Sequence, residues 1–417
     1  MKRTCLLGIL FAGWTIISHA QAERVWEKVP LPTGTTIGTV VYGIFINQSS
    51  GVKWLSVNSL GHEGVGGFKY IEPDDWTPFS STHHSHHDDS DSVEFDDNEI
   101  ISSDGSCIAI DYRGDVWFGF GNHGISVLSG TSWRHITTIS GLCSNSIQDI
   151  HAWGEDVWIA TKGGLNRYAG GKVTSLSVPE CGSDIRCFAT EKQGNLWVGT
   201  SQGAAMFDGT NWSGPYRPIK NSLASNFFKA LTIDLQGNIW ASIWDFGIYK
   251  FDGTNWSLEF DEYKQINCLA FDKKGHLWAG GVGVWEYDGT SWTKYTKEDD
   301  FLYHNNVQSI AIDKDGAVWL GNTNGLTKVY DYNVNISVFG EDMNIFVYPN
   351  PVQNQCIITN VNDATIALYT ITGQKTGTYH SLNEDLTIDT STLPSGIYML
   401  KIEKNNKTRF LKISIVH

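Results

Sequence analysis

A segment rich in histidine and aspartate holds the residues of this 417-residue chain that are best suited to bind metal. It reads HHSHHDDSD over residues 83–91, and further acidic residues follow up to residue 99. Imidazoles and carboxylates are ligands for zinc, and clustered carboxylates bind calcium. Zn or Ca is therefore a candidate cofactor, with His83, His84, His86, His87, Asp88 and Asp89 as ligands. A hydrophilic loop without metal affinity remains the alternative, because few apolar residues are present to order the segment.

This segment interrupts a repeat that is marked by tryptophan. The repeat positions are Trp54, Trp117, Trp158, Trp197, Trp240, Trp278 and Trp319, and the last five intervals are 41, 39, 43, 38 and 41 residues. The copies combine an Asp-x-x-Gly turn, a Leu-Trp-x-Gly strand and an Asp-Gly-Thr-x-Trp hairpin, which gives four short strands each. A period near 40 residues in such a sequence indicates a ring of repeats. We therefore expect an all-β chain with a seven-bladed β-propeller over residues 23–340, with each tryptophan packed between neighbouring blades.

The ring needs a strand from its own N-terminus. The seventh copy lacks the closing Asp-Gly-Thr-x-Trp strand, whereas residues 24–29 read RVWEKV and are suited to complete that blade. Closure of this kind removes open sheet edges.

One face of the ring carries the candidate ligand-binding residues. In a propeller, the loops that enter the inner strands and those between the second and third strands share a face. There the sequence places Phe120, Asn122, His123, Lys162, Arg186, Trp244, Asp245, Phe246, Tyr303 and His304. Exposed aromatic rings beside polar groups suit stacking on sugars. The alternative is that these residues seal the mouth of the pore.

The sequence leaves three classes of function open. The first hypothesis is a protein that binds a glycan or protein ligand through this face, and the alternative is a carbohydrate-active lyase or hydrolase. A scaffold or adhesin component is a third. No catalytic motif appears, so no catalytic residue is assigned, although an acid–base pair of His123 or His304 near Asp245 would favour an enzyme. The recurring Asp111, Asp234, Asp272 and Asp313 each precede a glycine by three residues, which is typical of turn-capping aspartates.

The net charge and an N-terminal targeting segment restrict the partners and the location that we expect for the protein. Residues 1–22 have a basic start, an apolar stretch and an Ala-Gln-Ala end, as in a signal peptide, and we expect no membrane span. Removing Lys2 and Arg3 with it would change the formal net charge from −15 to −17. Such a charge disfavours nucleic acid as a partner. We expect an exported monomer.

Six cysteines follow the signal segment. Cys107, Cys187 and Cys268 each lie ten residues before a repeat tryptophan, which indicates a small packing position on the inner strand. Cys143 and Cys181 precede adjacent inner strands, so a disulfide between them is a hypothesis in an oxidising exterior. Pairing of Cys181 with Cys187 is a rival.

Two family resemblances cover most of the chain. Residues 141–150 (GLCSNSIQDI) and 156–168 (DVWIATKGGLNRY) resemble the two-component regulator propeller repeat, which in that family forms the extracytoplasmic sensing half of hybrid histidine kinases. Here we expect only its binding role to carry over. Residues 345–417, with Pro349-Asn-Pro351, Gly373-Gln374 and Ser395-Gly-Ile-Tyr398, resemble the C-terminal sorting domain of type IX secretion cargo. This resemblance implies a β-sandwich over 341–417, export from a Bacteroidota-type cell through the type IX machinery, and a product that is released or held at the cell surface.

Overall fold

The chain forms two compact units of β-structure. The computed structural model describes residues 23–32, 35–59, 64–72, 74–81, 99–219, 226–261, 265–332, 345–350, 352–370, 374–404 and 407–416. One unit spans Arg24–Tyr330, and the other includes Asp331–His417. Within these described ranges, no helix is long and apolar enough to cross a membrane. Among the described residues, the one helical segment is the 3-10 turn η1 (Thr138–Ser140).

The larger unit consists of four-stranded antiparallel sheets, which we call blades and number in chain order. Blade 1 contains β2 (Val40–Ile46), β3 (Lys53–Asn58), β4 (Gly64–Ile71) and β5 (Asp75–Ser81). Blade 2 contains β6 (Gly105–Ile110), β7 (Val116–Phe120), β8 (Ile125–Ser129) and β9 (Ser132–Ile136). Blade 3 contains β10 (Ile147–Trp153), β11 (Asp156–Thr161), β12 (Gly164–Ala169) and β13 (Lys172–Leu176). Blade 4 contains β14 (Ile185–Thr190), β15 (Leu196–Thr200), β16 (Gly203–Phe207) and β17 (Trp212–Tyr216).

The remaining blades follow the same order, except that the last one takes a strand from the other end of the chain. Blade 5 contains β18 (Phe228–Ile233), β19 (Ile239–Ile243), β20 (Gly247–Phe251) and β21 (Trp256–Phe260). Blade 6 contains β22 (Cys268–Phe271), β23 (Leu277–Gly281), β24 (Gly283–Tyr287) and β25 (Trp292–Tyr295). Blade 7 contains β26 (Val307–Ile312), β27 (Val318–Asn322), β28 (Gly325–Tyr332) and, outermost, β1 (Glu23–Pro30).

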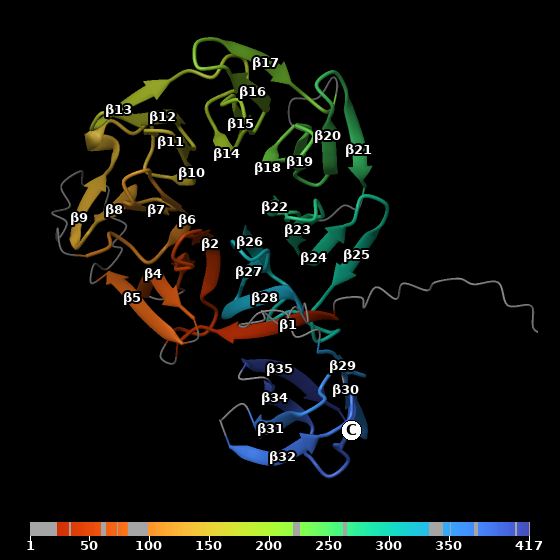
Figure 1. The fold of residues 1–417 in the computed structure, drawn as a ribbon. Coiled ribbons are helices and arrows are strands. Elements are labelled where there is room, and N and C mark those ends of the chain that lie inside the picture. The colour runs from red at the N-terminus through yellow and green to blue at the C-terminus, as the bar shows by residue number, and fades with distance from the viewer. Residues whose placement is uncertain are drawn as a thin grey trace, which may run out of the picture. The chain divides into compact units, whose positions relative to one another are not determined.

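The blades form a closed ring, so the unit is a β-propeller (Figure 1). The first strand of each blade is innermost, and each inner strand contacts the inner strands of both neighbouring blades. Blade 7 meets blade 1 through a hydrogen bond from Ser309 Oγ to the Val41 carbonyl (3.1 Å). The pairing of β1 with β28 confirms that the N-terminal segment completes the last blade.

The repeat tryptophans pack between blades, as their spacing predicts. Each faces an aromatic ring of the next blade, and the pairs run round the whole ring. The centroid distances are 6.4 Å for Trp54–Phe118, 4.9 Å for Trp117–Tyr168, 5.8 Å for Trp158–Phe207, 5.8 Å for Trp197–Phe251, 5.9 Å for Trp240–Tyr287, 6.1 Å for Trp278–Trp26 and 6.1 Å for Trp319–Tyr70. These aromatic pairs therefore contribute apolar packing at every junction between blades.

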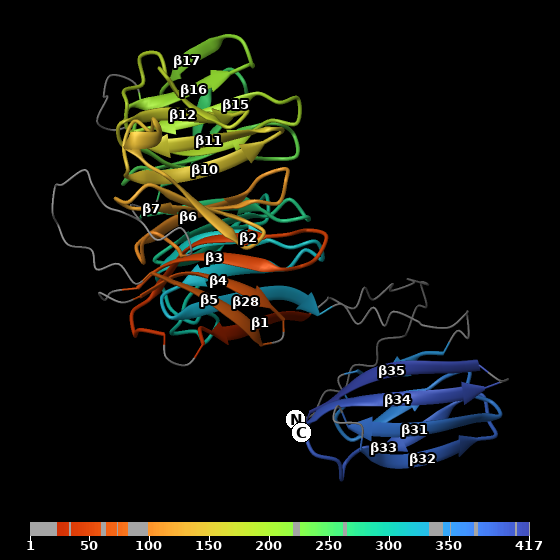
Figure 2. The same cartoon turned by 90° about the vertical axis from the view of Figure 1, so that its left-hand side faces the viewer.

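The smaller unit has two antiparallel sheets. One contains β29 (Val347–Tyr348), β30 (Gln355–Ile358) and β33 (Leu386–Asp389). The other has the order β32 (Lys375–Ser381), β31 (Ala364–Thr370), β34 (Gly396–Lys404) and β35 (Lys407–Ile415), and Figure 2 shows β31, β34 and β35 side by side. Buried residues of both sheets, among them Cys356, Ile366 and Leu400, form a core of their own. The unit therefore has its own two-sheet β-structure.

Candidate functional site

The inner strands share a backbone irregularity near their first residues. In β14, Ile185 pairs with Thr200 and Cys187 pairs with Gly199, so Arg186 is an extra residue without a cross-strand partner. A β-bulge of this kind redirects a side chain. The same bulge recurs in β2, β6, β10, β18 and β26. The bulged residues are Tyr42, Ser106, Gln148, Arg186, Lys229 and Gln308, and Asn267 holds the equivalent place just before β22.

These seven residues, which we call the bulge ring, face accessible space. Ile185 and Cys187 are buried whereas Arg186 between them is partly exposed, and the bulges of β2, β6, β18 and β26 show the same alternation. The inner strands that carry them encircle the centre of the propeller (Figure 1). Hydrogen bonds also link neighbouring blades, since Ser106 Oγ donates to the Ile147 carbonyl (3.0 Å) and Arg186 Nη1 donates to Gln148 Oε1 (2.8 Å). The bulges thus expose one polar or aromatic side chain per blade on the strands that encircle the centre of the ring.

Two neighbouring members of the bulge ring are cations. Arg186 Nη2 donates to Asp184 Oδ2 (2.6 Å), and its guanidinium lies 4.4 Å from the centroid of the Phe227 ring. Arg186 Nε has no hydrogen-bond partner among the described residues. That atom is buried, so Arg186 meets the accessible space with the 17% of its side chain that stays exposed.

Lys229, from the next blade, is the second cation. Burial lowers the pKa of its ammonium, and repulsion from Arg186 adds to this effect. Within the described part of the chain, no carboxylate forms an ion pair with Lys229; its ammonium lies 5.9 Å from the centroid of the Trp244 ring. The positive charge of Lys229 is thus not neutralised by an adjacent acid.

The loop between β19 and β20 adds aromatic surface next to these cations. The Trp244 amide donates to the Phe227 carbonyl (2.9 Å), and the two rings lie 6.1 Å apart. Asp245 has a positive φ of 62°, and Phe246 is 37% exposed. We call Arg186, Phe227, Lys229 and Trp244 the cationic corner.

The structure brings together only part of the residue set that the sequence singled out. Arg186 and Trp244 both contact Phe227, which the sequence reasoning missed together with Lys229. The position before the small packing residue, compared from blade to blade, would have revealed Lys229. Phe120, by contrast, is fully buried in the core between blades 1 and 2, so its expected exposure is wrong.

The other predicted residues lie elsewhere on the loops. Asn122 is exposed, and His123 Nδ1 lies 3.0 Å from Asp104 Oδ1, a hydrogen bond that raises the pKa of His123. Lys162 is exposed between β11 and β12. Tyr303 and His304 are half-buried ahead of β26, where His304 Nδ1 accepts a hydrogen bond from the Asn306 amide (3.0 Å). No contact between described residues joins His123 or His304 to Asp245.

The recurring aspartates accept hydrogen bonds from turn amides and from the repeat tryptophans. Asp234 Oδ1 accepts hydrogen bonds from the amides of Gln236 and Asn238, and its Oδ2 accepts the Trp240 indole N–H (3.0 Å). Asp111, Asp272 and Asp313 repeat this pattern with Trp117, Trp278 and Trp319. The predicted turn-capping role is confirmed, and each carboxylate also fixes the buried tryptophan six residues later.

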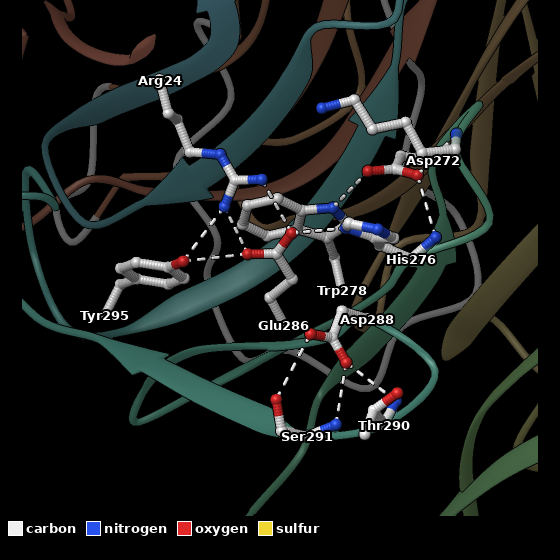
Figure 3. Close-up of polar contacts among 10 residues, drawn as sticks. Arg24, Asp272, His276, Trp278, Glu286, Asp288, Thr290, Ser291 and Tyr295 are labelled. Atoms are coloured by element: carbon white, nitrogen blue, oxygen red, sulfur yellow. Dashed lines mark hydrogen bonds and ion pairs between the residues drawn. The ribbon is translucent and has the colours of Figure 1, made fainter. Parts of the chain in front are cut away.

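A group of potential metal ligands lies in blade 6 (Figure 3). Ligand atoms of Asp272, His276 and Glu286 lie within 4.8 Å of one another. The Glu286 carboxylate, however, accepts two hydrogen bonds from the Arg24 guanidinium and one each from Tyr295 Oη (2.9 Å) and His276 Nδ1 (2.7 Å). Arg24 already supplies the positive charge that a metal ion would bring. The group is therefore a polar lock between β1 and blade 6.

The sequence reasoning missed one acid on the inner strand of blade 3. Asp149 occupies the inner-strand packing position that Cys107, Cys187 and Ala230 hold in other blades. Its Oδ2 accepts the Phe188 amide (3.1 Å) from blade 4. Burial raises the pKa of Asp149 to about 7, although hydrogen bonds from the Phe188 and Ile150 amides lower it. The carboxyl thus titrates near neutral pH.

The cysteines remain unpaired thiols in the structure. Cys143 Sγ contacts the Leu165 carbonyl (3.9 Å) and Cys181 Sγ the Ala204 carbonyl (3.5 Å), so each thiol is turned toward a strand of its own blade. The expected Cys143–Cys181 disulfide is therefore not formed, and Cys187 is likewise free. The candidate metal ligands from His83 to Asp89, and the signal segment 1–22, lie outside the described residues.

Family models match both parts of the chain. Residues 346–416 match the secretion system C-terminal sorting domain, and residues 179–202 and 304–324 match the two component regulator propeller. A regulator-type propeller is thus joined to a sorting domain. The sorting domain indicates type IX secretion and a secreted or cell-surface location. No curated protein matches the chain.

Solved structures support the propeller fold. The extracellular domain of a hybrid two-component system from B. thetaiotaomicron aligns with a TM-score of 0.54 and 16% identity over 91% of this chain. Only 55% of that domain is covered, so the present chain spans about half its length. Virginiamycin B lyase from Staphylococcus aureus, solved with quinupristin, aligns with a TM-score of 0.57 and 13% identity over 74% of this chain and 99% of the lyase. At these identities the likeness concerns the fold alone.

Proposed function

We propose that this secreted or cell-surface propeller is a binding protein that recognises a glycan or protein ligand through the face bearing the Trp244 loop, with a glycan as the favoured ligand. The observation that carries the proposal is the loop itself, which sets a half-buried Trp244 and an exposed Phe246 beside the bulge ring. Aromatic faces next to hydrogen-bonding groups suit the apolar face and hydroxyls of a sugar. In this proposal residues 1–22 direct export, residues 23–340 bind, and residues 341–417 engage the secretion machinery.

The placement of the histidines favours binding over catalysis by the acid–base pair that the sequence suggested. Among the described residues, neither His123, which pairs with Asp104, nor His304, which accepts from the Asn306 amide, contacts Asp245. A carbohydrate-active enzyme remains the alternative, and it would need a titrating pair within reach of one ligand.

The test uses the full mature chain with a panel of polysaccharides, measured for both retention and product release. Trp244→Ala should weaken retention about tenfold or more, because burying a large apolar side chain against a ligand contributes about 1.5–3 kcal/mol. Trp153→Ala is the matched control, since Trp153 is 42% exposed at the opposite end of the strands, where β10 turns into β11. Retention that is equally weakened by both substitutions would overturn the site. Released oligosaccharide would favour the enzyme.

A further inference from the structure

The cationic corner sets two positive side chains next to each other in a protein whose formal net charge is −15. Arg186 and Lys229 come from equivalent bulges of adjacent blades, and each shift of the backbone aims a side chain at the accessible centre. Their mutual repulsion is one cause of the lowered pKa of Lys229. This arrangement costs free energy in the unliganded protein.

The local acids only partly offset that cost. Asp184 binds Arg186 through Oδ2, while its Oδ1 has no hydrogen-bond partner among the described residues. Lys229 forms no ion pair within the same described set. An anion placed between the two cations would accept a hydrogen bond from the Lys229 ammonium and would be attracted by the charge of the Arg186 guanidinium, since carboxylate and sulfate oxygens are strong acceptors for such groups.

The corner also has aromatic walls. Phe227 lies under the Arg186 guanidinium, and Trp244 lies beside Phe227 and within 5.9 Å of the Lys229 ammonium. A ligand that carries its negative charge on a ring with apolar faces matches this combination better than a flexible acidic chain, because less conformational freedom is lost.

We propose that the cationic corner binds an acidic saccharide, with its carboxylate or sulfate ester between Arg186 and Lys229 and its ring against Trp244. This proposal rests on the glycan-binding role above and narrows its ligand class. Neutral glycans and acidic polypeptides are bound less tightly at this corner.

The experiment is calorimetric titration of the full mature chain with four probes: oligogalacturonate, dextran sulfate, unmodified dextran and polyglutamate. The first two separate carboxylate from sulfate as the recognised group. The expected result is binding of at least one acidic saccharide that weakens as salt is raised, since screening reduces attraction between charges. Lys229→Met should weaken this binding about tenfold or more, and Lys229→Arg should largely restore it.

Lys192→Met is the control with the same change of charge, because Lys192 is exposed in the turn between β14 and β15, at the opposite end of the strands. It should bind as the unmodified protein does. Acidic saccharide binding that survives Lys229→Met, or equal binding of polyglutamate, would overturn the proposal. Retention of neutral dextran alone would overturn the acidic-ligand inference but leave the glycan-binding function standing. If no saccharide binds and Trp244→Ala changes no interaction, both the acidic-ligand inference and the proposed glycan-binding function are wrong.

Discussion

Replacing Glu286 by glutamine should loosen the closure of the propeller. Glu286 is the acceptor in the polar lock, and only 6% of its side chain is exposed. Glutamine keeps the shape but turns one acceptor oxygen into a donor group that faces the donors of Arg24. The Arg24 guanidinium, 24% exposed, would then lose the charge of Glu286.

The size of the expected loss in stability follows from the burial of the Arg24–Glu286 ion pair. Removing one partner of a fully buried ion pair costs about 3–5 kcal/mol, and water that reaches Arg24 reduces this, so we expect about 2–4 kcal/mol. The pH dependence has a definite sign. Burial alone would raise the pKa of Glu286, but hydrogen bonds from Arg24 and His276 hold it below its usual value. The lock therefore contributes above the unfolded-state pKa near 4.5, and its contribution is lost as pH falls through the lower folded-state pKa.

Urea unfolding followed by tryptophan fluorescence measures this effect selectively. Apart from Trp14, every tryptophan lies between Trp26 and Trp319, so the signal reports the propeller and not the sorting unit. Asp300→Asn is the matched control: Lys28 of the same strand β1 pairs with Asp300, which is 93% exposed, and an exposed pair contributes little. If Glu286→Gln lowers stability no more than Asp300→Asn does, or if the difference persists unchanged well below pH 4, the account of the lock is wrong.

Three further substitutions and one deletion test other parts of the reasoning. Trp26→Ala should cost about 3 kcal/mol by the same assay, because this ring packs on Trp278, Tyr295 and Phe301; an unchanged midpoint would show that β1 does not close the ring. Asp234→Ala should cost about 1–3 kcal/mol by removing the acceptor of two amides and the Trp240 indole, and a red-shifted folded-state emission should accompany it. Asp149 has a folded-state pKa of about 7, raised above its unfolded value, so the free energy of unfolding should fall as the pH rises from about 4 to 7. The fall should reach up to about 4 kcal/mol, at about 1.36 kcal/mol per pKa unit. Asp149→Asn should remove this slope, and an identical slope in the variant would contradict the assignment. Any zinc or calcium taken up in calorimetry should be lost on deleting residues 82–98, because Arg24 occupies the blade 6 group; uptake that persists would point back to that group.

Features that recur within one blade were predictable from the sequence. The tryptophan spacing and the capping aspartates depend on residues that are near in sequence or repeated at a fixed period, whereas the closing strand followed from a strand missing in the seventh copy; the structure confirms all three. Contacts across blades were not predictable in this way. The lock joins Arg24 to Glu286, which are 262 residues apart, and neither belongs to the repeat motif. Phe120 was misassigned because its neighbours in sequence form an exposed loop, whereas its ring turns into the core.

The bulge ring separates what the fold requires from what a ligand requires. In each inner strand the residues on either side of the bulge are constrained by packing, as Ile185 and Cys187 show by their burial. The bulged residue faces accessible space, so its type can change from tyrosine to serine to lysine without disturbing the pairing register. Contacts with Asp184, Gln148 and Phe227 hold Arg186, but no ion pair among the described residues holds Lys229, and repulsion between the two cations opposes their adjacency. The acidic-ligand proposal supplies a reason for this adjacency, and it predicts that the pair, more than the tryptophan repeat, sets the ligand specificity of the propeller.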